Sequence, residues 1–138
     1  MAERNGPIVR MPLRVRYHEC DQQGIVFHAH YLAYADMASF EVFKALFGSH
    51  AVLLERGVDV VVAESTVRYL APCRFDDDLS VEPHVERLGT TSLALRYEIR
   101  RDGTLAAEVT NRYVWVDPEA LRPTAPPGDV RDAFREFT

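Results

Sequence analysis

The sequence predicts an α+β protein in which one long helix packs on an antiparallel sheet of about five strands. Residues 31–47 contain only four polar side chains in seventeen positions, which is typical of a buried helix. Most segments after residue 57 alternate apolar and polar residues with a period of two, which is typical of half-buried strands. Asp102-Gly103 between two such segments favours a tight hairpin, so these strands are expected to be antiparallel neighbours.

Length and composition indicate a single domain spanning residues 1–138. With 138 residues and 47% hydrophobic side chains, the chain is long and apolar enough to form one core. Its formal net charge of −5 argues against a general nucleic-acid or membrane-surface binder, since such proteins carry basic patches. No segment is long and apolar enough to span a membrane, and residues 1–6 lack the apolar region of a signal peptide. We therefore expect a cytoplasmic protein in which Cys20 and Cys73 are free thiols.

The first half of the chain predicts a tail, a strand, a turn and the helix, in that order. Residues 1–7 are expected to be a frayed tail, and residues 13–18 alternate apolar and polar side chains as a half-buried strand does. Residues 21–24 favour a turn. The helix over residues 31–47 is apolar nearly all round, so we expect it to be buried nearly all round. Its predicted end is Gly48.

The second half of the chain predicts four strands and a terminal helix. The run 60–63, within a strand over residues 58–70, is apolar at every position, which favours a central strand buried on both faces. Three further strands are predicted at residues 79–85, 93–99 and 105–117. Residues 118–138 favour a proline-rich connector followed by a short helix. A sheet of this size around one helix leaves open edges, which association of copies would cover.

The turn before the long helix carries the residues best suited to chemistry. Asp21 is a carboxylate that can attack a thioester carbonyl or deprotonate a water molecule. The backbone N–H of His28 lies where the helix begins, and unpaired donors at a helix start can bind an oxyanion. Gly24 permits close approach of the backbone to a ligand. The alternative is structural: Asp and Gly are common in turns, and His28 would face solvent.

Other polar residues are weaker candidates for a site. Carboxylates on buried elements must be paired or face a water-filled site, which makes Asp36, Glu41 and Glu64 second candidates for a general base. Four arginines can hold phosphates or simply cover strand faces: Arg68, Arg74, Arg87 and Arg96. The residue types of His18, Cys20, His28 and His30 suit zinc, but they lack the usual ligand spacing, so no metal is expected.

The run from Tyr17 to Tyr31 resembles the start of the 4-hydroxybenzoyl-CoA thioesterase family of hotdog-fold acyl-CoA thioesterases. In that family two acidic positions around one residue precede two variable residues, a glycine, two aliphatic residues, an aromatic residue and a helix with an early tyrosine. Here these positions are Glu19-Cys20-Asp21, Gln22-Gln23, Gly24, Ile25-Val26, Phe27 and Tyr31. A second match is Val67-x-Tyr69-x-x-Pro72 followed by Phe75-x-Asp77-x-Leu79. The resemblance covers about residues 10–117, and it departs at Glu19, where the family has Asp.

This resemblance implies a hotdog fold and the hydrolysis of an acyl-CoA to CoA and a carboxylic acid, without a cofactor. It implies that Asp21 is the catalytic carboxylate and that the His28 N–H binds the thioester oxygen. His28 also matches a histidine of the bacterial Tol–Pal-associated branch. Tyr17, Gly24, Phe27 and Tyr31 are expected to bind substrate, in a homodimer or homotetramer with active sites at subunit interfaces.

Three alternatives to a hydrolase of acyl-CoA stay open on the sequence. The same pocket suits a non-catalytic module that binds acyl-CoA or an acyl carrier protein. A hydratase on this fold needs a histidine and a second acid in a pattern that the sequence lacks. A metal-binding protein is the third alternative.

Overall fold

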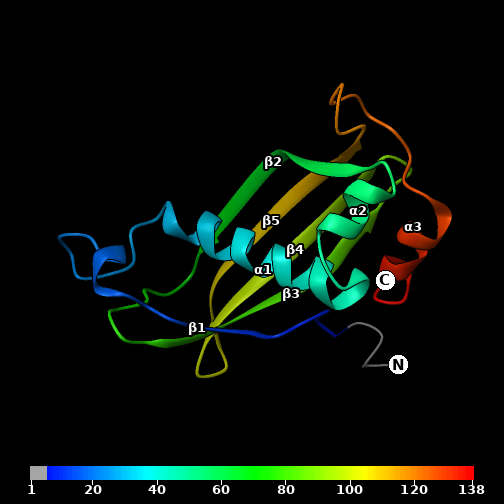
Figure 1. The fold of residues 1–138 in the computed structure, drawn as a ribbon. Helices are drawn as coiled ribbons and strands as arrows, with labels where there is room; N and C mark the ends of the chain where they lie inside the picture. The colour runs from blue at the N-terminus through cyan, green and yellow to red at the C-terminus, as the bar shows by residue number, and fades with distance from the viewer. Residues whose placement is uncertain (1–5) are drawn as a thin grey trace.

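The computed structural model describes residues 6–138 and consists of a five-stranded antiparallel sheet with one long helix lying across its face (Figure 1). The strands are β1 Met11–Arg14, β2 Asp59–Tyr69, β3 Asp78–Leu88, β4 Ser92–Arg101 and β5 Thr104–Val116. The helices are α1 His30–Phe47, α2 Ala51–Glu55 and α3 Gly128–Arg135, with a 3₁₀ turn at Tyr17–Glu19. The predicted α+β class is confirmed. The predicted tail over residues 1–7 falls largely outside the described residues.

The strands lie in the order β1-β3-β4-β5-β2, so β1 and β2 form the two edges of the sheet. Consecutive hairpins join β3, β4 and β5. At the β4–β5 turn Asp102 has φ of 50° and Gly103 has φ of 78°. Positive φ at both central residues is the requirement of a type I′ turn, which explains why this dipeptide closes the hairpin.

The core lies between α1 and the concave face of the sheet. Ala35 and Ala38 are buried on α1, and their small side chains let the helix approach the strands closely. Tyr97 and Tyr113 lie beneath it and share a hydrogen bond of 2.6 Å between their hydroxyls. Burial is the main cause that raises the pKa of both phenols. No helix among residues 6–138 is long and apolar enough to cross a bilayer.

Two predictions about burial were wrong. The run 60–63 does not belong to a central strand, because β2 is an edge strand and Val61 and Val62 are 38% and 50% exposed. The helix α1 is not buried all round, since Leu32, Met37 and Phe40 remain exposed. In both cases the apolar pattern overestimated burial, because it does not show which elements of the chain cover each face.

The first strand is also shorter than predicted. β1 ends at Arg14, and the chain then turns through the 3₁₀ segment Tyr17–Glu19. Tyr17 therefore leaves the alternating pattern and is 78% exposed, with its ring against Phe75 at 5.7 Å between centroids. The local turn overrides the period of two because Glu19 accepts the Arg16 N–H at 2.8 Å.

Candidate active site

The turn at residues 21–24 holds its carboxylate by backbone hydrogen bonds. The Asp21 N–H donates to the Ile25 carbonyl at 2.9 Å, and the Gly24 N–H donates to the Asp21 carbonyl at 2.9 Å. Gly24 has φ of 78°, a conformation that other residues adopt only with strain. Oδ1 of Asp21 accepts the Gln23 N–H at 2.8 Å, while Oδ2 makes no hydrogen bond within residues 6–138. One carboxylate oxygen thus fixes the side chain, and the other remains open to a ligand.

Glu19 ties this turn to the helix α1. Its Oε1 accepts the Tyr34 hydroxyl at 2.9 Å, and its carbonyl accepts the Phe27 N–H at 2.9 Å. Burial first, and then the hydrogen bond to Glu19, raise the pKa of the Tyr34 phenol. Glu19, the position that departs from the family pattern, therefore serves as an anchor of the loop that carries Asp21.

The start of α1 presents an unused backbone donor. The His30 N–H donates to the Phe27 carbonyl at 2.9 Å, whereas the His28 N–H has no acceptor within residues 6–138. The Tyr69 hydroxyl donates to the His28 carbonyl at 3.0 Å, so the end of β2 fixes the backbone at the helix start. Such a donor, together with the positive end of the helix dipole, favours an anionic oxygen nearby.

A pocket of about 440 Å³ lies where the turn, the start of α1 and the end of β2 meet. This volume is in the range of pockets that bind small molecules. Its walls include Asp21, Ile25, His28, Tyr31, Tyr69 and Leu70. The structure thus brings the carboxylate of Asp21 and the start of α1 into one cavity.

The predicted substrate-binding residues lie in different places. Tyr31 lines the pocket with Asp21 and His28. Tyr17 and Gly24 line a separate hollow on the other side of the same turn, which Asp21 also lines. Phe27 lines neither hollow, and its ring lies 4.4 Å from that of His28 between centroids.

Sequence reasoning did not assign the segment 69–72 to the site, although it supplies one wall of the pocket. The signal was present, because Tyr69 and Pro72 belong to the second matched motif. The Val26 N–H donates to the Cys73 carbonyl at 2.8 Å and so holds this segment against the loop. Burial raises the pKa of the Cys73 thiol, which makes it a packing residue rather than a thiolate nucleophile.

The second candidates for a general base lie outside this pocket. Asp36 and Glu41 are on the exposed side of α1, and Glu64 forms an ion pair with Arg112 at 3.6 Å.

Two of the candidate phosphate-binding arginines are paired with carboxylates. Arg68 contacts Glu108 at 3.4 Å, and Arg96 contacts Glu86 and Glu98 at 2.8 and 3.2 Å.

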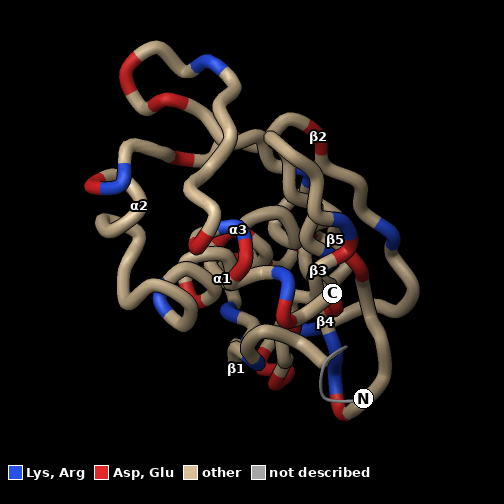
Figure 2. The backbone as a smooth tube through the Cα atoms, turned by 90° about the vertical axis from the view of Figure 1, so that its right-hand side faces the viewer, with Lys and Arg blue, Asp and Glu red and all other residues tan. Residues whose placement is uncertain are grey.

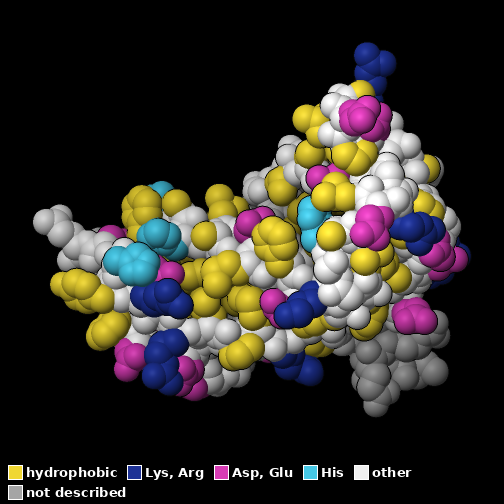
Figure 3. All heavy atoms as spheres, in the orientation of Figure 1, with side chains coloured by type: hydrophobic (Ala, Val, Ile, Leu, Met, Phe, Trp, Pro, Cys, Tyr) yellow, Lys and Arg dark blue, Asp and Glu magenta, His cyan; other side chains and the backbone are white. Residues whose placement is uncertain are grey.

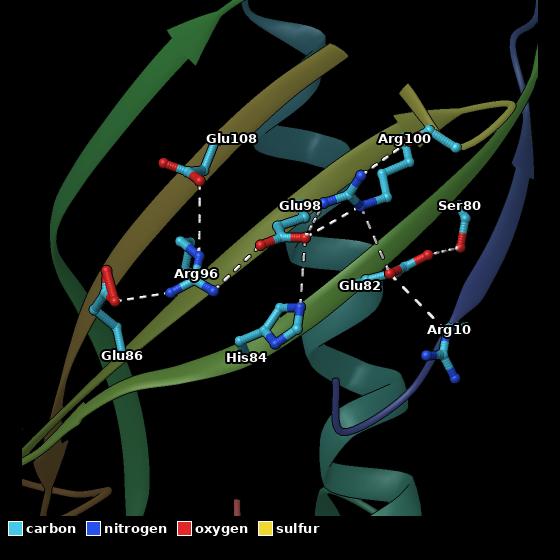
Figure 4. A network of polar contacts seen from close by, with 10 residues as sticks. Arg10, Ser80, Glu82, His84, Glu86, Arg96, Glu98, Arg100 and Glu108 are labelled. Atoms are coloured by element: carbon cyan, nitrogen blue, oxygen red, sulfur yellow. Dashed lines mark hydrogen bonds and ion pairs between the residues drawn. The ribbon is translucent and has the colours of Figure 1, made fainter. Parts of the chain in front are cut away.

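One group among residues 6–138 has the composition of a metal site, namely Glu82, His84 and Glu98. It lies on the outer face of β3 and β4, within a network of ion pairs (Figure 4). Burial raises the pKa of Glu98, but hydrogen bonds from Arg100 and Arg96 and the His84 charge lower it on balance.

More than one guanidinium group already balances the two carboxylates of this group. Arg100 approaches Glu98 Oε1 at 2.8 Å, and its Nε lies 3.9 Å from Glu82 Oε1. Acidic and basic residues are similarly interspersed over much of the chain trace (Figure 2). The geometry therefore favours an ion-pair network over a metal site, since a divalent cation would displace Arg100.

The sequence model of a known family, described as the thioesterase superfamily, matches residues 23–107 of the chain. The chain belongs to the thioesterase superfamily. The predicted enzyme class, a thioester hydrolase, agrees with this membership. The match begins two residues after Asp21, so it does not bear on the role of that carboxylate.

Individual relatives extend the likeness over most of the chain. The chain is 33% identical to the acyl-CoA thioester hydrolase YbgC of Escherichia coli, over 96% of this chain and 99% of that one. It is 29% identical to the acyl-CoA thioesterase YbgC of Haemophilus influenzae, over 91% and 93%. A hypothetical protein from Thermus thermophilus has the same fold, with a TM-score of 0.84 and 29% identity over 94% and 98%. The predicted hotdog thioesterase fold is confirmed.

Proposed function

We propose that this member of the superfamily hydrolyses acyl-CoA thioesters to CoA and a carboxylic acid, with Asp21 as the nucleophile or general base. The observation that carries the proposal is that Asp21, with one uncommitted oxygen, and the unused His28 N–H border the same pocket. The names of the YbgC relatives support acyl-CoA as the thioester donor.

The geometry supports two closely related reaction paths. In the first, Asp21 attacks the thioester carbonyl, CoA leaves as the thiolate, and water hydrolyses the resulting anhydride. In the second, Asp21 removes a proton from the water that attacks the carbonyl. In both, negative charge develops on the carbonyl oxygen, where the His28 N–H and the helix dipole would stabilise it.

Release of free thiol from a panel of aromatic and aliphatic acyl-CoAs tests this proposal. We expect the wild-type protein to release thiol from at least one of them, and the preferred acyl group would define the pocket. Calorimetry measures whether the protein binds the same acyl-CoAs. If it binds them but releases no thiol, either from them or from the same acyl groups on an acyl carrier protein, the protein is a binding module and not a hydrolase.

We propose further that two copies pair through β2. An edge strand of eleven residues exposes a row of backbone donors and acceptors that antiparallel pairing with a second copy would satisfy. The apolar run 60–63 has the pattern of a central strand, which β2 becomes in such a dimer. Apolar side chains also gather over the exposed side of α1, next to this edge (Figure 3).

Charge complementarity selects a register for this pairing. Glu64 and Arg68 both lie on the outer face of β2, where their in-chain partners are Arg112 and Glu108. If Thr66 faces the partner's Thr66, each Glu64 lies opposite the partner's Arg68. Opposite charges at facing positions stabilise antiparallel strands, and the two-fold axis repeats the pair.

Tyr69→Phe is expected to lower kcat about fivefold with little change in KM. The substitution removes the hydrogen bond of 3.0 Å that fixes the His28 carbonyl, and a hydrogen bond of this kind contributes about 1 kcal/mol. Steady-state thiol release measures both constants. Tyr113→Phe is the matched control, because it also removes a tyrosine hydroxyl that makes a hydrogen bond, to Tyr97 at 2.6 Å, but Tyr113 does not line the pocket of Asp21. An unchanged kcat for Tyr69→Phe would remove Tyr69 from the positioning of the helix start.

A further inference from the structure

Three arginines from distant parts of the chain line one hollow of about 470 Å³ between the end of β3 and α3. They are Arg87 of β3 and Arg131 and Arg135 of α3, and this space is called the arginine hollow below. It shares no lining residue with the pocket of Asp21, and none of its lining residues belongs to β2. In Figure 1, α3 lies at the opposite end of the molecule from the loop that carries Asp21. The roles proposed above therefore do not use the arginine hollow.

Local structure directs these three side chains to the same place. The register between β3 and β4 shifts between Val85 and Arg87, and a bulge of this kind re-aims the side chains beside it. Arg131 and Arg135 are four residues apart on α3, so they lie on one face of that helix. The strand and the helix thus present their guanidinium groups to one space.

The guanidinium groups of the arginine hollow are largely uncommitted. Arg87 forms no ion pair or side-chain hydrogen bond within residues 6–138. Arg131 Nε donates to the Gly89 carbonyl at 3.0 Å, which fixes the side chain and leaves its two terminal nitrogens available. Arg135 has an exposed contact with Asp132 at 3.5 Å, which is worth little in water.

Neighbouring acidic groups do not neutralise these arginines. Glu86 also lines the arginine hollow, but its Oε1 already accepts a hydrogen bond from Arg96 Nη1 at 2.8 Å. Thr138 lines it as well, and within the described residues 6–138 it forms no ion pair with any of the three arginines. An excess of positive charge in one hollow of a chain with a net charge of −5 favours an anionic ligand there.

The number and kind of these donors favour a ligand with more than one negative charge. Each guanidinium presents a planar fork that can bind two oxygens of a phosphate. Three such groups balance more charge than a single carboxylate carries, which favours a diphosphate. The volume is in the range of sites for small organic molecules, and Val85 and Leu88 add apolar surface against which a base can pack.

We propose that the arginine hollow binds an organic diphosphate of nucleotide size, at a site separate from the pocket of Asp21. Arg87 and Arg131 hold the diphosphate from the two sides of the hollow, and Arg135 adds positive charge. A free nucleoside diphosphate and CoA both carry this group. The proposal does not depend on the proposed thioesterase function, because binding is measured without turnover.

Calorimetric titration of the purified protein with ADP tests the proposal. We expect saturable binding of one ADP per chain, and weaker binding of inorganic phosphate. Arg87→Gln and Arg131→Gln are each expected to raise the Kd of ADP about tenfold, because each removes hydrogen bonds to a charged group. Arg122→Gln is the matched control, since Arg122 is an exposed arginine of the β5–α3 connection that lies outside the arginine hollow.

Three results would overturn the proposal. The first is the absence of saturable ADP binding by the wild type. The second is an equal rise in Kd for Arg87→Gln and Arg122→Gln, which would show general attraction of anions. The third is competition between ADP and acyl-CoA in hydrolysis that is as strong in Arg87→Gln as in wild type, which would place the nucleotide in the substrate site. Arg87→Gln breaks no side-chain contact within residues 6–138, so it remains informative if Arg131→Gln does not fold.

Titration with CoA distinguishes the two sources of the diphosphate. The quantity compared is the part of the binding that Arg87→Gln weakens. If this part is tighter for CoA than for ADP, the ligand is the coenzyme. If it is tighter for ADP, the ligand is a free nucleotide.

Discussion

Asp21→Asn is expected to lower kcat by two orders of magnitude or more while the fold is retained. The amide cannot act as a nucleophile or accept a proton at neutral pH, so the chemical step loses its base in either reaction path. Its remaining oxygen can still accept the Gln23 N–H that now bonds to Oδ1 at 2.8 Å, so the turn keeps its shape. Because the effect falls on the transition state, KM is expected to change much less than kcat.

Thiol release by purified Asp21→Asn, beside wild type and Asp132→Asn, measures this effect. Asp132 is an exposed aspartate of α3, far along the chain from the loop, and it controls for the loss of one negative charge. Thermal unfolding of the three proteins shows whether they are equally folded. Turnover within a few fold of wild type by a folded Asp21→Asn protein would exclude Asp21 as nucleophile or base.

Elements that depend on local sequence could be predicted well. The helix α1 begins one residue before the predicted segment and ends at the predicted Phe47, because an apolar run followed by Gly48 is a local signal. The β4–β5 hairpin likewise follows from Asp102-Gly103 alone. The turn that carries Asp21 and the start of α1 are only a few residues apart, which is why both could be placed at one site from the sequence.

Features that depend on distant parts of the chain could not be predicted in this way. Tyr69 and Leu70 reach the pocket through the pairing of β2 with β5, which residue spacing does not reveal. The hydrogen bond of 2.8 Å between His50 and Asp59 likewise depends on how α2 leads into β2. The errors about residues 60–63 and the exposed side of α1 are of another kind. For a single chain, the apolar pattern predicted burial that the structure does not show. In the proposed dimer, the partner would cover these same side chains.

Reversing one charge on β2 is expected to weaken the proposed dimer strongly, and reversing its partner as well is expected to restore it. Glu64→Arg places two guanidinium groups opposite each other, and the two-fold axis repeats this repulsion. Each facing charge pair changes the pairing energy by up to about 1 kcal/mol, and the axis makes two such pairs. Since ~1.4 kcal/mol is a tenfold change, the dimer Kd should rise about tenfold. The double variant Glu64→Arg/Arg68→Glu regains two opposite-charge pairs across the axis. Sedimentation equilibrium measures the Kd of each protein.

The double variant separates the pairing from damage within the chain. Both substitutions disrupt in-chain ion pairs, Glu64 with Arg112 and Arg68 with Glu108, and the double variant disrupts both. In each pair at least one side chain is largely exposed, Glu64 at 67% and Arg68 at 62%. Each pair therefore contributes little to stability. Recovery of the dimer in the more altered protein can therefore come only from contacts between subunits. If the active site is completed by the partner, thiol release at low protein concentration should fall with Glu64→Arg and return with the double variant. If neither change alters the Kd, the subunit contact lies on another surface than β2.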